Sequence, residues 1–350
     1  MKQEGGNDDL ECLRLFVSDC SAIMTISQSN SLVPIIEVRG LTRKYGDVLA
    51  VDRIDFSVNR GEVFGFLGPN GAGKSTTVRM LTGYIPPNAG TVTVAGYDLA
   101  SHATAARRHL GVVPEEANVY ADLTVWQNLM LMAELHGIAK EQRIRNGKDL
   151  LDLFGLADRG KQKGNQLSKG LRQRLMLCMA LVSDPDILFL DEPTSGLDVA
   201  SSRLIREVIT RMNRSKRMTV FLTTHNIEEA GELCHRVAIM NKGRIAAIDT
   251  PQSLRATLQS RRSVEVRFSG GTTPPAEVLD FGAAGETVRL AHGVRIFGTE
   301  PGQIAQELAN RATARGFRIE YLSTVEPSLE EVFVHITGKG ATLPRGANHV

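Results

Sequence analysis

Residues 62–76 read EVFGFLGPNGAGKST, and this stretch decides the fold of the chain. Its first part, Glu62 to Leu67, is almost continuously apolar, which is typical of a strand covered on both faces in a parallel sheet. The strand leads directly into a glycine-rich turn that fits the phosphate-loop pattern of glycine, four residues and Gly-Lys-Ser. A strand, this turn and a helix in succession predict an α/β fold with a parallel sheet at its core.

The turn has the composition needed to hold a nucleotide phosphate. Its glycines let backbone N–H groups approach an anion, and the helix predicted to start near Lys74 adds its positive end. Lys74 would reach the β- and γ-phosphate oxygens, and the Ser75 hydroxyl would take a position on Mg²⁺. The predicted nucleotide-binding residues of the turn are Gly68, Pro69, Asn70, Gly71, Ala72, Gly73, Lys74, Ser75 and Thr76. A chance match has a probability on the order of a few per cent, and the flanking strand and helix favour the functional interpretation.

Two carboxylates follow another buried strand. The apolar run Ile187 to Leu190 ends in Asp191-Glu192, so both side chains lie at the C-terminal end of a sheet strand, where ligands of α/β folds bind. We predict that Asp191 holds the Mg²⁺ shell and that Glu192 polarises an attacking water. A lone Asp-Glu pair is more often a solvated turn, but the continuation Pro193 to Asp198 is not typical of a generic turn.

The length of 350 residues fits two domains and terminal tails. Strands and helices alternate over 35–254, with helices expected between about 121 and 165, and a small α+β domain is predicted over 255–338. Ser328 and Glu331 form a capping-box pattern at the start of its last helix, which ends at Gly338. Residues 1–34 and 339–350 are predicted to be tails, and we hypothesise that translation starts at Met24 rather than Met1.

Composition excludes several classes of protein. Hydrophobic residues at 42% and charged residues at 23% exclude a disordered, collagen-like or coiled-coil chain. A net charge of +2 gives no basic field for nucleic acid. No apolar run approaches the about 20 residues of a membrane-spanning helix. The N-terminus lacks the pattern of a secretory signal, and the four cysteines, Cys12, Cys20, Cys178 and Cys234, fit a reducing cytosol.

Over about residues 35–255 the chain resembles the ATP-binding subunit of an ATP-binding-cassette (ABC) transporter. Five motifs follow the order and spacing of that family: the phosphate loop, a signature at 167–171, the Asp191-Glu192 pair, the loop Ser195 to Asp198, and a switch histidine at His225. The resemblance implies a parallel sheet core, an antiparallel β subdomain and a helical signature subdomain, with a small accessory domain appended.

The resemblance also implies roles for particular residues. Catalysis would rest on Glu192, His225 and Lys74, and the metal would be held by Ser75 and Asp191. The remaining nucleotide contacts would come from Tyr45, which stacks on adenine, and from Glu115, Ser168, Lys169, Gly170 and Asp198. Considered alone, Ser168 is only the cap of a helix predicted over Arg172 to Val182, His225 only a loop residue, and Tyr45 only a core or surface tyrosine.

Two positions depart from the commonest family pattern. The signature has Lys169 and Leu171 where glycine and glutamine are usual, and Glu115 stands where the family usually has a glutamine that touches Mg²⁺. Both departures resemble the drug- and antibiotic-exporter branch, and the last helix, from Pro327 to Gly338, resembles the end of that branch's accessory domain. A carboxylate near Mg²⁺ changes the local charge by a full unit, so the role of the glutamine does not transfer directly to Glu115.

The resemblance implies an ATP hydrolase that uses ATP and Mg²⁺ and works as a head-to-tail pair of identical chains. A separate membrane permease would carry the transport path, docked on the helical segment at about 118–165, at the cytoplasmic face of the membrane. Trp126, Met130 and Met132 in this segment are each better interpreted as ordinary core. The expected function is export of a drug-, antibiotic- or lipid-like compound, with no nucleic acid as partner.

Two alternatives remain open from the sequence. One is an ABC ATPase that acts on DNA or ribosomes, although no coiled coil, zinc-ligand insertion or second cassette is visible. The other is a phosphate-loop kinase or nucleotide-dependent switch, which would leave Ser168 and His225 without a role. Co-purification of a permease, a ribosome or neither would discriminate between them.

Overall fold

The computed structural model describes residues 33–116, 118–258, 262–271, 275–279, 281 and 286–338. Nearly all of the predicted tail 1–34 lies outside these residues, and so do Cys12, Cys20, the candidate start Met24 and the predicted tail 339–350. The chain divides into two compact units: the first holds the residues up to Phe64 and Ser75–Leu222, and the second holds Gly65–Lys74 and the residues from Thr223 onwards. The domain boundaries predicted from the sequence stay predictions.

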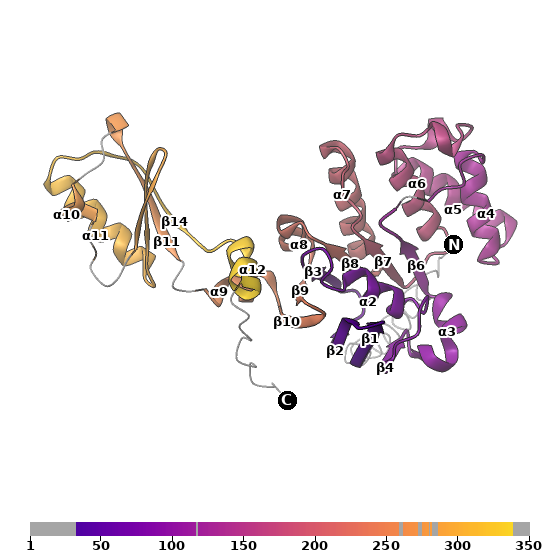
Figure 1. Ribbon diagram of the computed structural model, residues 1–350. Helices are drawn as coiled ribbons and strands as arrows, with labels where there is room; N and C mark the ends of the chain where they lie inside the picture. Colours follow the sequence, from indigo (N-terminus) through magenta and orange to yellow (C-terminus); the bar gives the residue numbers. More distant parts are fainter. Residues whose placement is uncertain are drawn as a thin grey trace, which may run out of the picture. The chain divides into compact units, whose positions relative to one another are not determined.

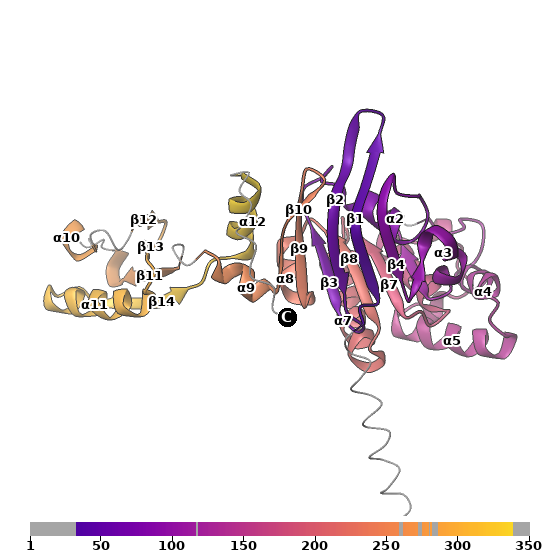
Figure 2. The ribbon, with the colours of Figure 1, turned by 90° about the horizontal axis from the view of Figure 1, so that it is seen from below.

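The first unit contains an antiparallel sheet with the strand order β2-β1-β4-β5. Its strands are β1 (Ile36–Tyr45), β2 (Val48–Val58), β4 (Ala89–Val94) and β5 (Tyr97–Asp98). Strands β1 and β2 form a long hairpin that Figure 2 shows from the side. Alternate apolar residues of these strands are buried, which is the period of two expected for a half-buried strand.

A six-stranded sheet forms the α/β core, with the order β10-β9-β3-β8-β7-β6. The strands are β3 (Val63–Leu67), β6 (Leu110–Val113), β7 (Ile187–Asp191), β8 (Thr219–Thr224), β9 (Arg236–Asn241) and β10 (Arg244–Asp249). Every residue of β3, β7 and β8 is buried, and β6 pairs with β7 in parallel from Leu110↔Ile187 to Val113↔Leu190. These observations confirm the predicted α/β fold and its apolar central strands.

Aromatic rings fill the core of the first unit between these strands. The ring centroids of Phe56 and Phe64 lie 5.6 Å apart, and Phe221 lies 5.4 Å from Phe189. All four rings are at least 90% buried, and such pairs add about 0.5–1.5 kcal/mol each beyond their buried area. The core of the first unit therefore includes aromatic side chains of β2, β3, β7 and β8.

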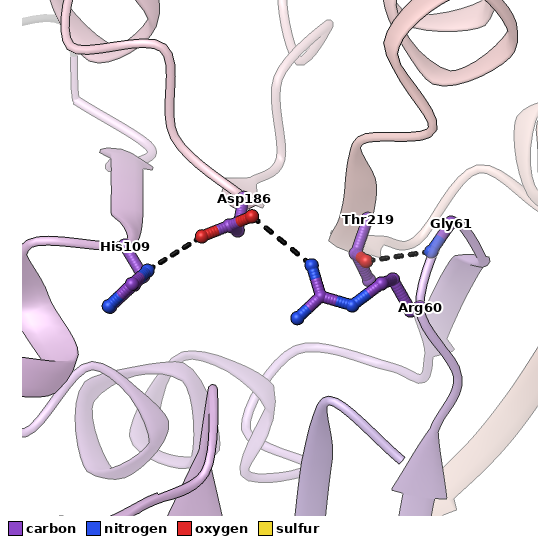
Figure 3. Close-up of polar contacts among 5 residues, drawn as sticks. All are labelled: Arg60, Gly61, His109, Asp186 and Thr219. Carbon is purple, nitrogen blue, oxygen red and sulfur yellow. Dashed lines mark hydrogen bonds and ion pairs between the residues drawn. The ribbon is translucent and has the colours of Figure 1, made fainter. Parts of the chain in front are cut away.

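Charged residues join three chain segments before β3, β6 and β7 (Figure 3). Asp186 accepts hydrogen bonds from Arg60 at 3.2 Å and pairs with His109 Nδ1 at 2.6 Å. Partial burial alone would raise the pKa of Asp186, but the hydrogen bonds from His109 and Arg60 outweigh it and lower the pKa below 3.8. The Gly61 N–H donates to Thr219 Oγ1 at 2.9 Å beside this cluster.

Six α-helices complete the described part of the first unit. They are α2 (Lys74–Leu81), α3 (Leu99–Arg107), α4 (Val125–Leu135), α5 (Lys140–Leu153), α6 (Lys169–Leu181) and α7 (Val199–Lys216), with single 3₁₀ turns at Ala157–Arg159 and Gly164–Gln166. Helices α4, α5 and α6 contact one another (Figure 1). Trp126 and Met130 of α4 meet α5 at Gly147, where an added Cβ would lie 2.6 Å from Met130 Cε. Both side chains and that of Met132 are half-buried, so these three residues are not part of the fully buried core that the sequence predicted.

One helix start was predicted wrongly. Helix α6 begins at Lys169 and not at Arg172, because Ser168 is its N-cap and its Oγ accepts a hydrogen bond from the Leu171 N–H at 3.4 Å. The signature residues after Ser168 therefore belong to the first turn of the helix rather than to a loop before it.

The second unit contains α8 (Ile227–Leu233), α9 (Pro251–Ala256) and α12 (Leu329–Gly338), which contact one another in part (Figure 1). Its four-stranded sheet has the order β12-β13-β11-β14, with β11 (Ser263–Phe268), β12 (Thr287–Leu290), β13 (Gly293–Phe297) and β14 (Ile319–Val325). Helices α10 (Ala276–Leu279) and α11 (Pro301–Ala314) complete the α+β part, and Val264, Val266 and Leu308 lie in its apolar core. The predicted capping box is confirmed, because Ser328 and Glu331 exchange hydrogen bonds at 3.0 and 3.1 Å.

Within the described ranges, no helix is both long and apolar enough to cross a membrane.

Candidate active site

The phosphate loop lies between β3 and α2, as predicted. Its turn is closed by a hydrogen bond from the Ala72 N–H to the Pro69 carbonyl at 3.1 Å, and Gly71 has a φ of +79°, which favours glycine. Gly68 is needed for a different reason: an added Cβ would lie 2.5 Å from the Met240 carbonyl oxygen. The Gly243 N–H donates to the Ala72 carbonyl at 3.0 Å, so the segment after β9 supports the loop from behind.

Lys74 is buried at the first position of α2. Its Nζ donates to the Gly68 carbonyl at 2.8 Å and to the Pro69 carbonyl at 3.3 Å. An ammonium group buried beside two carbonyl oxygens remains attractive to an anion, because carbonyl dipoles satisfy its hydrogen bonds without cancelling its charge. The loop thus holds a positive charge at the start of α2.

Ser75, the residue after Lys74 in α2, contacts Asp191. The Ser75 hydroxyl donates to Asp191 Oδ1 at 3.3 Å, and Asp191 is the last residue of β7. Glu192 follows with a φ of +51° and is 8% exposed, an uncommon backbone conformation for glutamate that places its carboxylate directly after the strand. Such strained conformations cluster at functional sites.

The oxygen atoms of this pair fit Mg²⁺. Mg²⁺ is usually held by one or two carboxylates together with substrate phosphates and water, and not by a cage of protein ligands. Ser75 and Asp191 would hold the ion, and the ion would neutralise charge on the phosphates.

Glu115 lies at the same cavity as this pair. A cavity of about 990 Å³ in the first unit is lined by Ser75 and Asp191 on one side and by Glu115 in the loop after β6. Arg79 and Arg107 also line it, together with Met132 of α4. The structure therefore brings the predicted metal pair and Glu115 to one hollow that also reaches the helical segment.

A second group of predicted residues lies on α6 and in the loop before α7. Lys169 Nζ donates to the Ser195 carbonyl at 2.9 Å. Gly170 packs so closely on α7 that an added Cβ would lie 2.5 Å from Ser201 Oγ and 3.3 Å from Asp198 Oδ2. The signature residues and the loop Ser195–Asp198 thus form one cluster in the first unit.

Asp198 is the N-cap of α7. It accepts hydrogen bonds from the Ser201 N–H and the Ser201 hydroxyl, both at 2.8 Å. The backbone hydrogen bond, followed by the hydroxyl, lowers the pKa of Asp198, and Arg174 nearby adds to this effect. Asp198 is therefore an ionised carboxylate that orders the start of α7.

The last two predicted residues are Tyr45 and His225. Tyr45 ends β1 with 42% of its side chain exposed, and the Arg43 guanidinium lies 4.7 Å from its ring centroid. His225 is exposed in the second unit between β8 and Asn226, the N-cap of α8. Thr224 Oγ1 donates to the buried Glu229 at 2.8 Å, so the residues around His225 are anchored on both sides.

Two residues of the second group were not predicted, Ser201 and Arg174. Arg174 Nη2 donates to Ser201 Oγ at 3.0 Å, which links α6 to α7. The sequence carried a signal for Ser201, since it stands three residues after Asp198, the spacing at which an N-cap side chain meets a backbone N–H. It carried none for Arg174, because only tertiary packing brings α6 beside α7.

Comparison with known proteins gives the family. A family model described as ABC transporter matches residues 51–195. The linearmycin resistance ATP-binding protein of Bacillus subtilis is 33% identical over 87% of this chain and 98% of its own length. The fluoroquinolones export ATP-binding protein of Mycobacterium tuberculosis is 38% identical over 88% of this chain and 95% of its own. Among solved structures, a dimeric post-hydrolysis ATP-binding cassette bound to ADP and Pi is 25% identical, with a TM-score of 0.57 over 61% of this chain and 98% of that one.

The chain belongs to the ATP-binding proteins of ABC transporters. It is accordingly an ATP-binding protein and an ATP hydrolase, and the predicted family, fold and ATPase activity are confirmed. Cassettes of this family form dimers, as the solved structure illustrates. The roles of the individual site residues stay predictions.

Proposed function

We propose that this chain is the Mg²⁺-dependent ATP-hydrolysing subunit of an exporter, with Ser75 and Asp191 as the metal-holding pair. The observation that carries this proposal is the 3.3 Å contact between the Ser75 hydroxyl and Asp191 at the end of the phosphate loop. Residues Gly68 to Thr76 would cradle the phosphates, and Lys74 would exchange its two carbonyl partners for phosphate oxygens.

Glu192 is the proposed general base. Its carboxylate follows Asp191 directly, so it would lie near the γ-phosphate and orient the attacking water. His225 and Lys74 would stabilise charge on the transferred phosphoryl group, which is electrostatic positioning and requires no covalent intermediate. Glu115 would face the metal across the cavity that it shares with Asp191. There its negative charge would repel the negative charge of the phosphates.

A second copy of the chain would complete each site. The start of α6, at Ser168, Lys169 and Gly170, and the loop ending at Asp198 would cover ATP held by the phosphate loop of the partner, with Tyr45 stacked on adenine. A two-fold head-to-tail pair of this kind uses the same surface on both chains. The exposed position of Ser168 and Lys169 on the first turn of α6 supports this arrangement.

The transport path would belong to a separate permease, which places this chain at the cytoplasmic face of a membrane. The segment 118–165 is the proposed docking surface, since its helix α4 reaches the cavity that contains Glu115 and Asp191. The names of the relatives, linearmycin resistance and fluoroquinolones export, support a drug- or antibiotic-like compound as the cargo. The residues 255–338 would form the accessory domain that such subunits carry.

Cells that lack this gene provide the test. We expect increased sensitivity to at least one compound in a panel of antibiotics, rescued by the wild-type gene and not by Lys74→Ala, and co-purification of a membrane permease with the tagged chain. Unchanged sensitivity across the panel together with co-purification of ribosomes or DNA would overturn the exporter assignment and leave the ATPase assignment intact.

A further inference from the structure

Ser201 connects the starts of two helices in the first unit. Its N–H and its hydroxyl both donate to Asp198, each at 2.8 Å, and its Oγ accepts from Arg174 Nη2 at 3.0 Å. The hydroxyl thus links the Arg174 guanidinium on α6 to the Asp198 carboxylate that caps α7. Only 4% of Ser201 is exposed, so water competes little with these bonds.

Two further contacts hold the same pair of segments together. Gly170 allows α6 to approach Ser201, because any side chain at position 170 would overlap the hydroxyl, which would lie 2.5 Å from an added Cβ. Lys169 Nζ donates to the Ser195 carbonyl at 2.9 Å on the exposed side of the cluster. Lys169 therefore joins α6 to the loop Ser195–Asp198, and Gly170 and Arg174 join the first two turns of α6 to Ser201 at the start of α7.

This arrangement exceeds what a helix cap requires. Capping of α7 needs only the bond from the Ser201 N–H to Asp198, which an alanine at position 201 would retain. The hydroxyl adds the bond to Asp198 Oδ2 and the acceptor for Arg174, and both serve to fix the loop relative to α6.

We propose that Ser201 is a positioning residue for ATP hydrolysis: its hydroxyl joins Asp198, the last residue of the loop Ser195–Asp198, to Arg174 on the second turn of α6, so that the loop and the start of α6 meet the partner's nucleotide as one rigid surface. This inference rests on the proposed role of both segments in covering ATP bound by a second copy. Loss of this link, which we call the lock, would leave nucleotide binding to the phosphate loop intact and would slow the closed, hydrolytic state.

The variant Ser201→Ala in the full chain tests the lock, with Ser202→Ala as the matched control on the next residue of α7. We expect Ser201→Ala to lower kcat by about 10-fold, because a small misplacement of a positioned group costs one to two powers of ten in rate. The affinity for a fluorescent ATP analogue, measured with Mg²⁺ absent, should stay at the wild-type value. Ser202→Ala should match wild type in both measurements.

A double-mutant cycle with Arg174→Met separates positioning from general destabilisation. If Arg174 and Ser201 act through one link, the double variant Arg174→Met/Ser201→Ala should lose no more kcat than the more affected single variant. Fully multiplicative losses would overturn the lock, as would a Ser201→Ala variant with a lowered melting temperature and wild-type kcat. Should Ser201→Ala fail to fold, Lys169→Met and its cycle with Arg174→Met report on the same pair of segments. A wild-type chain without ATPase activity would instead refute the proposed function itself.

Discussion

Single glycines in the phosphate loop are fixed by different physical constraints. Gly71 has a φ of +79° in open space, so the backbone conformation selects it. Gly68 is selected by crowding, because the Met240 carbonyl oxygen leaves no room for a Cβ. The loop therefore depends on a strand, β9, that lies more than 160 residues further along the sequence.

We predict that Gly68→Ala abolishes ATP binding, because the added methyl would push the loop away from Met240 and misplace its N–H groups. Isothermal titration with ATP would measure the loss. Gly96→Ala is the control: its φ is +83° with no atom within 4 Å, so it should cost about 1 kcal/mol of stability and leave ATP affinity unchanged. Retained affinity in Gly68→Ala would contradict the steric account.

The lowered pKa of Asp186 predicts that the stability of the folded chain depends on pH in acid solution. This pKa is lowered below 3.8 in the folded chain, so the stability that Asp186 contributes is present above that value and is lost as pH falls through the folded pKa. The side chain is 41% exposed, so the contribution is below about 1 kcal/mol. Melting temperatures of wild type and Asp186→Asn should differ near pH 5, and the difference should shrink as the pH falls through the folded pKa of Asp186. A gap that widens on acidification would show that the sign is wrong.

At the scale of residues, the sequence predicts what is local. The phosphate loop and the Asp191-Glu192 pair are contiguous motifs, and the structure places them at a strand end as expected. The lock at Ser201 was not predictable in full, because Arg174 and Gly170 reach it only through the packing of α6 on α7. The cluster of Arg60, His109 and Asp186 was missed for the same reason, since its members lie far apart in the chain.

Among the elements, the last helix, α12, packs on helices α8 and α9 and on strand β10 (Figure 1). Leu329, Val332 and Ile336 of α12 are buried. Asn241 Nδ2 at the end of β9 donates to the Thr337 carbonyl at 3.4 Å. Helix α12 thus supports the helix that begins two residues after His225.

We predict that Val332→Asp destabilises the second unit by about 3 kcal/mol, because it places an unpaired charge at a fully buried position. Val334→Asp in the same helix is the matched control, since Val334 is 60% exposed and its change should stay within about 0.5 kcal/mol. Urea unfolding would measure the change in stability of each variant. Hydrogen exchange of the α8 amides would show whether the helix that packs on α12 is affected. Equal effects of the two variants would contradict the packing of α12.

Elements with a continuous apolar run or a complete capping pattern were predicted from the sequence, and weakly patterned ones were not. The apolar strands β3 and β7 and the capping box of α12 match the prediction. Strand β12 is missing from it, because its residues are mostly exposed and its pairing with β13 supplies the structure that its own pattern does not indicate. The predicted start of α6 lies about one turn after the observed start, because the first two residues of the helix, Lys169 and Gly170, do not belong to its apolar pattern.

For the whole molecule, we propose that ATP bound by the phosphate loop is hydrolysed with Glu192 as general base in a pair of identical chains. Glu192 is buried in a left-handed backbone conformation after β7, next to the residue that contacts Ser75. A neutral isostere at this position keeps the shape and the binding surface of the site. It removes the negative charge of the carboxylate and with it the ability to accept a proton from water.

The most direct measurement is therefore the steady-state ATPase rate of Glu192→Gln beside its oligomeric state in ATP and Mg²⁺, determined by light scattering. We predict a loss of turnover of roughly 10²- to 10⁴-fold and an unchanged ATP affinity. The dimer should accumulate, because the ATP that holds the two chains together is not hydrolysed. Turnover close to that of wild type would contradict the assignment of Glu192. A chain that stays monomeric with ATP bound would contradict the paired site.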